Sequence, residues 1–199
     1  MTNEYHFVTR WQFEGVIQEV YDLIHNAPSY PRWWPSVYLE VKEIAPGDER
    51  GRGRRIRLHT KGWLPYTLRW ESRATEVERP RRLIIRASGD FDGRGIWTLE
   101  QCNRLVDVTF DWRIKADKPL LRYFSFFLKP AFAANHRWAM ARGEESLRLE
   151  LARRRARTAD EANRIPAPPG PNRTSGLWLT LGTVIVLVML AALFRLVWR

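Results

Sequence analysis

A small set of polar side chains could orient a ligand or carry a proton. Tyr66 and Thr60 share the phase of apolar residues in two predicted strands, while Asn135 and His136 lie on a predicted helix. A hydroxyl, an amide or a neutral imidazole can hold a substrate oxygen, and tyrosine or histidine can also transfer a proton. Each residue also has a structural explanation, because a tyrosine at the rim of a core and a locally satisfied helical asparagine are frequent in proteins.

The remaining chemistry-bearing residues predict neither a metal site nor a cofactor. The four histidines, His6, His25, His59 and His136, have no metal-ligand spacing. Cys102 is the only cysteine, so the chain cannot form an internal disulfide. This cysteine usage agrees with a reducing compartment.

The elements around these residues predict an α+β fold. Val106, Val108, Phe110, Trp112 and Ile114 alternate with polar residues, which is typical of a half-buried antiparallel strand. The same period of two recurs along the chain and predicts about seven strands. Five of them are Tyr5–Phe13, Val37–Ile44, Leu83–Ser88, Gly93–Glu100 and Val106–Ile114. The other two are a strand that contains Ile56 and Leu58, and a strand that contains Tyr66, Leu68 and Trp70.

Helices are predicted after the first strand and at the end of the folded part. Val16, Val20, Leu23 and Ile24 fall at helical spacing, and the prolines between 28 and 35 restart the chain as a second short helix. A long helix follows over residues 120–157, with a kink expected at Pro130.

Three segments carry a resemblance to a known family. They are Trp33-Trp34-Pro35, residues 93–99 (GRGIWTL) and residues 135–147 (NHRWAMARGEESL). With the order of elements, they make residues 4–157 similar to the START-like superfamily, also called polyketide cyclase/dehydrase and lipid transport. The resemblance implies a helix-grip fold, in which a curved antiparallel sheet surrounds a long C-terminal helix. It also implies an apolar cavity for a hydrophobic ligand such as a lipid, a quinone or a polyketide-like aromatic.

The inward-facing residues point independently to such a cavity. The predicted inner face and the facing helix hold more large aromatics than a small core commonly needs, and rings of that size can leave gaps between them. Any one of these aromatics could equally be a core residue. The predicted ligand-binding residues are Ile56, Leu58, Tyr66, Leu68, Trp70, Trp97, Phe110, Trp112, Phe124, Phe127, Asn135 and Trp138.

The C-terminal segment predicts one transmembrane helix. Leu177–Phe194 contains no charged residue and is apolar on every face. Residues 176–198 are long enough, at about 1.5 Å per residue, to cross a hydrocarbon core of roughly 30 Å. Trp178 and Trp198 lie where interfacial aromatics are expected.

Residues 158–175 are predicted to link this helix to the domain. The segment contains four prolines and has no periodic apolar pattern. Fully extended as polyproline, its residues could reach roughly 55 Å. We therefore expect a ligand-binding domain at 1–157, a linker at 158–175 and a transmembrane helix at 176–198.

The charge balance indicates an anionic partner. The formal net charge is +11, from 33 basic and 22 acidic residues. Such a surface attracts anionic lipid or nucleic acid, and a membrane anchor favours lipid. Arg153–Arg155 and Arg157 are the candidate contacts. Because the first 30 residues resemble no signal peptide, we expect a single-pass membrane protein whose N-terminal domain lies in the cytoplasm.

Three functions fit these features. The leading one is membrane-anchored binding or transfer of a hydrophobic small molecule, without catalysis. A polyketide cyclase or dehydratase is the enzymatic alternative, with Tyr66 or His136 as proton carrier. A regulatory module that acts through macromolecular partners is the third.

Overall fold

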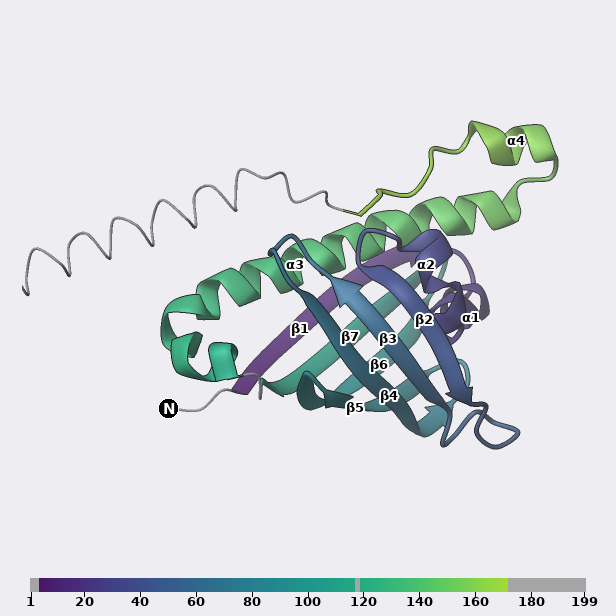
Figure 1. Ribbon diagram of the computed structural model, residues 1–199. Coiled ribbons are helices and arrows are strands. Elements are labelled where there is room, and N and C mark those ends of the chain that lie inside the picture. Colours follow the sequence, from purple (N-terminus) through teal and green to yellow (C-terminus); the bar gives the residue numbers. More distant parts are fainter. Residues whose placement is uncertain (1–3, 117–118, 172–199) are drawn as a thin grey trace, which may run out of the picture.

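Figure 1 shows one strongly curved sheet with a long helix lying across it. This computed structural model describes residues 4–116 and 119–171, of which positions 116 and 119–128 are described by their backbone alone. Within that part of the chain, the strands are β1 (Glu4–Glu14), β2 (Tyr38–Ala45), β3 (Arg55–Lys61), β4 (Thr67–Glu78), β5 (Arg82–Gly89), β6 (Phe91–Cys102) and β7 (Leu105–Ala116). The helices there are α1 (Ile17–His25), the 3-10 turn η1 (Ala27–Ser29), α2 (Tyr30–Trp33), α3 (Pro119–Arg155) and α4 (Ala159–Arg164).

The sheet is antiparallel throughout, in the order β1-β7-β6-β5-β4-β3-β2. β1 pairs with β7 along its whole length, from Glu4 opposite Lys115 to Glu14 opposite Leu105. The first two strands therefore lie at opposite edges, and α1, η1 and α2 carry the chain between these edges. The predicted helix-grip architecture with a seven-stranded sheet and a C-terminal helix is confirmed.

Alternating side chains give the sheet an apolar inner face. In β7, Val106, Val108, Phe110 and Trp112 are buried, and the residues between them are more exposed. α3 covers this inner face in Figure 1, and its first turns lie at an angle to the rest of the helix. Pro130 falls inside α3, where it removes a backbone donor and disturbs regular helical geometry.

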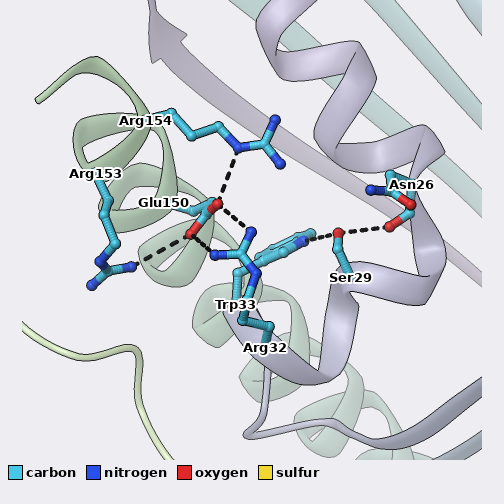
Figure 2. A network of polar contacts seen from close by, with 7 residues as sticks. All are labelled: Asn26, Ser29, Arg32, Trp33, Glu150, Arg153 and Arg154. Carbon is cyan, nitrogen blue, oxygen red and sulfur yellow. Dashed lines mark hydrogen bonds and ion pairs between the residues drawn. The ribbon is translucent and has the colours of Figure 1, made fainter. Parts of the chain in front are cut away.

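A buried carboxylate fastens the C-terminal half of α3 to α2. The Glu150 side chain is only 2% exposed, and Figure 2 shows three arginines converging on it. Arg32 of α2 lies 2.5 Å from it, while Arg154 and Arg153 of α3 lie at 3.0 and 3.4 Å. Burial raises the pKa of Glu150, but hydrogen bonds from Arg32 and Arg154 outweigh this effect, so the pKa is below its usual value. The charged form therefore holds the network together.

The arginine cluster at the end of α3 is engaged within the fold. Besides contacting Glu150, Arg153 donates a hydrogen bond to the carbonyl of Pro166, at 2.8 Å. Arg155 lies 2.6 Å from the carboxylate of Glu19 on α1. All of these partners belong to the same chain, so the predicted contact of this cluster with a lipid surface is not supported.

Among residues 4–116 and 119–171, no helix is both long and apolar enough to cross a membrane. The predicted span at 176–198 lies outside the described residues. Most of the predicted linker is described, and it begins with α4, in which Thr158 caps the helix by accepting a hydrogen bond from the backbone N–H of Glu161.

Candidate ligand-binding cavity

A cavity of about 220 Å³ lies between the inner face of the sheet and α3. Side chains from β1 and β3–β7 form its floor and walls. Phe132, Asn135, His136, Ala139 and Met140 contribute from α3. Its lining is mainly apolar, so the cavity suits a hydrophobic guest.

Stacked aromatic rings form much of the floor. The rings of Trp97 and Phe110 lie 4.0 Å apart at an angle of 17°, and Phe110 and Trp112 lie 5.4 Å apart at 24°. Trp70 continues the row, with its ring centroid 6.0 Å from that of Trp112. Because Trp97, Phe110 and Trp112 stack on one another, the row presents a continuous aromatic wall to the cavity. Aromatic guests can pack edge-to-face or offset against such a wall at centroid distances of roughly 4.5–7 Å.

Gly95 of β6 makes room for these rings. A Cβ atom at this position would lie 2.8 Å from a ring carbon of Trp112 and 2.9 Å from one of Phe110. No ordinary side chain fits so close a contact without moving the rings. The glycine in the GRGIWTL segment thus has a packing role beneath the aromatic row.

One polar group on the floor is already satisfied. Thr60 Oγ1 accepts a hydrogen bond from Trp70 Nε1 at 3.2 Å and donates to the carbonyl of Leu68 at 3.4 Å. This pairing orients the Trp70 ring and leaves Thr60 little capacity for a ligand.

Two buried polar atoms at one end of the cavity have no hydrogen-bond partner among the described residues. They are the hydroxyl of Tyr5 on β1 and Nε2 of His136 on α3. Phe7 connects the two residues, since its ring stacks on His136 at 4.3 Å and on Tyr5 at 6.0 Å. Burial raises the pKa of the Tyr5 hydroxyl. Burial, assisted by the charge of Arg137, lowers the pKa of His136 to about 4, so its imidazole is neutral at neutral pH.

Tyr66 lies at the same end of the cavity. Its ring meets Phe132 edge-on at 6.3 Å, and Phe132 meets Tyr5 in the same way at 5.8 Å. Burial, with a smaller contribution from Tyr5, raises the pKa of Tyr66 to about 12. Tyr5, Tyr66 and His136 are therefore neutral at neutral pH, and each can exchange hydrogen bonds with an uncharged oxygen.

Asn135 ties α3 to the loop between β3 and β4. Its side-chain oxygen accepts hydrogen bonds from the backbone N–H groups of Trp63, at 2.8 Å, and Leu64, at 3.3 Å. Gly62 permits this approach, because a Cβ there would lie 2.1 Å from the same oxygen. Asn135 and Gly62 both line the cavity, so this contact closes the cavity at the loop.

The other end of the cavity is built from α1, α2 and β2. His25 lines it, and its Nδ1 lies 3.0 Å from the Arg79 guanidinium. Burial and the charges of Arg79 and Arg54 lower the pKa of His25 to about 4. The Tyr30 hydroxyl donates to the carbonyl of Ile24, while Nε1 of Trp34 is buried without a partner among the described residues.

Most of the predicted ligand-binding residues come together around this cavity. Nine of them line it: Ile56, Leu58, Tyr66, Leu68, Trp70, Trp97, Phe110, Trp112 and Asn135. Trp138 packs against the core but does not line the cavity. Phe124 and Phe127 lie outside the residues whose side chains are described. Ligand binding by any of these residues stays a prediction.

The sequence-based prediction missed several lining residues. Tyr5 and Phe7 point inward from β1, and Trp34, Phe91 and Phe132 also line the cavity. The alternation in β1 already carried a signal for the first two. In the described part of the chain, no three His, Cys, Asp or Glu side chains gather in a group that could hold a metal ion.

A family model places this chain among known proteins. The chain belongs to the polyketide cyclase / dehydrase and lipid transport family, whose model matches residues 14–141, more than half of the sequence. The predicted membership of this superfamily is confirmed. No curated protein matches the chain.

Several solved structures share the fold. TTHA0849 from Thermus thermophilus is 15% identical with a TM-score of 0.59, covering 72% of this chain and 97% of its own. The Zhui aromatase/cyclase from Streptomyces sp. R1128 is also 15% identical with a TM-score of 0.59, and the match covers 78% of this chain and 98% of the Zhui chain. One di-domain aromatase/cyclase, BexL from the BE-7585A biosynthetic pathway, is 12% identical with a TM-score of 0.56. The match covers 73% of this chain and 49% of the BexL chain.

Proposed function

We propose that the domain binds a small hydrophobic molecule with a flat aromatic body and a polar oxygen at one end. The stacked row of Trp97, Phe110 and Trp112 on the cavity floor carries this proposal. Aromatic rings favour an aromatic guest over a flexible chain, because edge-to-face or offset contacts add about 0.5–1.5 kcal/mol beyond burial of area.

Cavity size narrows the class of ligand. The volume of about 220 Å³ lies below the roughly 300–1,000 Å³ of typical ligand pockets. This volume suits two or three fused rings and is too small for a phospholipid with two acyl chains. Among the lipid, quinone and polyketide-like ligands considered from the sequence, the last two fit better.

The unpartnered polar atoms supply the second element of recognition. A buried donor or acceptor without a partner costs about 1–3 kcal/mol. A phenol or carbonyl oxygen that reaches this end of the cavity could pair with the Tyr5 hydroxyl or with Nε2 of His136, and Tyr66 lies at the same end. The ligand would then be oriented with its rings over the aromatic row and its oxygen toward β1 and α3.

Membrane anchoring is a further part of the proposal. The uncharged stretch at 177–194 would hold the domain at the cytoplasmic face of a bilayer, where hydrophobic molecules partition. The domain would take its ligand from that bilayer or deliver it there. Recovery of the full chain in alkaline-washed membranes tests the anchor separately from ligand binding.

A cyclase or dehydratase activity is the second candidate. The buried, unpartnered Nε2 of the neutral His136 favours it, since such a nitrogen could accept a proton from a bound substrate. Tyr66 could hold the oxygen on which charge develops. Conversion of a bound polyketide-like substrate that is lost in His136→Phe would support catalysis, whereas unchanged release of the bound molecule would support binding alone.

The binding experiment uses the full chain in neutral lipid nanodiscs. Calorimetric titration with 1-naphthol is expected to give saturable binding at one site, and naphthalene is expected to bind more weakly because it lacks the oxygen. Ala139→Phe fills the cavity from α3 and should weaken 1-naphthol binding roughly tenfold or more. Ala141→Phe, on an exposed position of the same helix, is the matched control. Equal binding by the two variants would overturn the proposal.

A further inference from the structure

The outer face of the sheet carries an unbroken row of arginines. Strand register places Arg55 of β3 opposite Arg73 of β4, and Arg73 opposite Arg86 of β5. Arg86 is opposite Arg94 of β6, which in turn is opposite Arg113 of β7. All five side chains reach solvent on this face. We call them the arginine row.

The row concentrates charge along one line. Neighbouring strands lie about 4.8 Å apart, so five arginines extend over roughly 19 Å. Like charges directly opposite one another destabilise a sheet. Four successive like-charged pairs therefore work against folding. An external anion would remove this repulsion.

Few acidic groups of the protein neutralise the row. Arg55 lies 2.8 Å from Glu71 at one end, and Arg113 lies 3.2 Å from Asp111 at the other. In the described part of the chain, the guanidinium groups of Arg73, Arg86 and Arg94 have neither an ion pair nor a hydrogen bond. The neighbouring pair on the same face of β3 and β4 is not like-charged, because Arg57 lies opposite Glu71 and forms an ion pair with it. The positive charge of the row is therefore less compensated than that of this neighbouring pair.

We infer that the arginine row is a docking surface for an anionic phospholipid bilayer. Guanidinium groups bind phosphate well, and basic residues near an anionic membrane each strengthen attraction to it. The chain also continues into the uncharged stretch predicted to enter a bilayer. Residues 167–175, which follow the Pro166 carbonyl bound by Arg153, could extend roughly 28 Å as polyproline, and this length would let the domain turn its outer face to the membrane surface.

The outer face lacks the rings with which proteins hold single-stranded nucleic acid. All five aromatic residues of β3–β7, namely Trp70, Phe91, Trp97, Phe110 and Trp112, line the cavity on the opposite face. Proteins that bind single strands stack bases on exposed aromatics. This surface can therefore bind phosphate groups but has no rings on which bases could stack. Because the predicted anchor would hold the domain near a bilayer, we take lipid phosphate as the partner.

The test measures how closely the domain approaches a lipid surface. Cys102 is the only cysteine and is exposed, so it accepts a fluorescent donor in the full chain. The chain is reconstituted in phosphatidylcholine vesicles with and without phosphatidylserine, and energy transfer to a headgroup-labelled lipid is recorded. Transfer is expected to rise when phosphatidylserine is present and to fall again at high salt.

Two triple variants separate the row from overall charge. R73Q/R86Q/R94Q removes the unpaired centre of the row, and R50Q/R104Q/R137Q removes the same charge from scattered exposed positions. The first is expected to weaken docking roughly 100-fold, and the second should retain most of it. The first variant should also be at least as stable as the wild type, because it removes repulsion.

Three results would overturn the inference. Equal loss in both triple variants would show that only net charge matters. Energy transfer that does not respond to phosphatidylserine would show that the domain does not dock on anionic lipid. Binding of duplex RNA that depends on the row and exceeds binding to vesicles would assign the surface to nucleic acid. Uptake of 1-naphthol is measured in the same samples, so failure of docking is distinguished from failure of the cavity to bind.

Discussion

The imidazole of His136 lies flat against the ring of Phe7, with centroids 4.3 Å apart and planes within 16°. This contact joins α3 to β1 at the polar end of the cavity. It also buries the histidine, leaving Nε2 without a hydrogen-bond partner among the described residues. The same contact thus shapes the cavity and makes protonation of His136 unfavourable in the folded state.

Acid should therefore destabilise the domain through His136. Its pKa is about 4 when folded, against about 6.5 when unfolded. Between these values the unfolded state binds more protons, so stability is complete above about pH 6.5 and is lost as the pH falls toward 4. Urea unfolding should show His136→Phe losing less stability than the wild type between pH 7 and pH 5, by on the order of 2 kcal/mol.

The control for this experiment is His6→Phe, which removes an exposed imidazole from β1. It is expected to leave the steep loss of stability in acid unchanged. His25, whose pKa burial and Arg79 also lower to about 4, contributes in the same pH window. His136→Phe should consequently reduce the acid sensitivity without abolishing it. Identical pH profiles for His136→Phe and the wild type would contradict the prediction.

Replacement of Glu150 should weaken the attachment of α3 to α2. Glu150→Gln leaves Arg32, Arg153 and Arg154 without their shared carboxylate. Because removing one partner of a buried ion pair costs about 3–5 kcal/mol and these arginines are partly exposed, we expect a loss of about 3 kcal/mol. Chemical denaturation of the variant measures it. Glu145→Gln breaks an exposed pair with Arg142 on the same helix and should change stability by less than about 1 kcal/mol.

Much of the fold was predictable because each strand carries its own period-two pattern. Phe110 and Trp112 were assigned to the inner face from alternation alone, and both line the cavity. Trp138, by contrast, packs against the core without lining the cavity. The apolar residues of α3 form no single clean stripe, so its sequence does not define which helix face meets the cavity.

The sequence did not predict which residues of different strands and helices lie side by side. Arg73, Arg86 and Arg94 lie on three consecutive strands, and only the register of these strands sets them in line. Likewise, nothing local brings Tyr5 near His136. Such juxtapositions depend on register and helix docking, which a one-residue shift would change entirely.

Gly95→Ala should disrupt the aromatic floor of the cavity. The new methyl group would lie under 3 Å from ring atoms of both Trp112 and Phe110, so the rings must move. Overpacking of this kind typically costs about 1–3 kcal/mol. Unfolding measurements report the loss of stability, and the near-ultraviolet circular dichroism of the tryptophans reports the displacement of the rings. Gly170→Ala, where a Cβ atom would have no neighbour within 4 Å, should leave both signals unchanged. An unchanged spectrum in Gly95→Ala would mean that the rings are not packed as described.

Asn135 should control how fast a ligand enters and leaves the cavity. Its side-chain oxygen holds the N–H groups of Trp63 and Leu64, and thereby fastens the β3–β4 loop to α3. Asn135→Ala removes both hydrogen bonds, which together contribute about 1–3 kcal/mol. If opening of this loop limits exchange, association and dissociation of 1-naphthol should both accelerate, by roughly fivefold or more, while the dissociation constant changes little.

Stopped-flow fluorescence of the cavity tryptophans measures both rate constants. The control is Asn163→Ala, on an exposed position of α4 and outside the cavity lining. Gly62→Ala provides an independent test of the same contact, because its Cβ would displace the Asn135 oxygen and should accelerate exchange as well. Faster dissociation with unchanged association would mean that Asn135 holds the ligand itself, and unchanged rates in both variants would show that the loop does not gate the cavity.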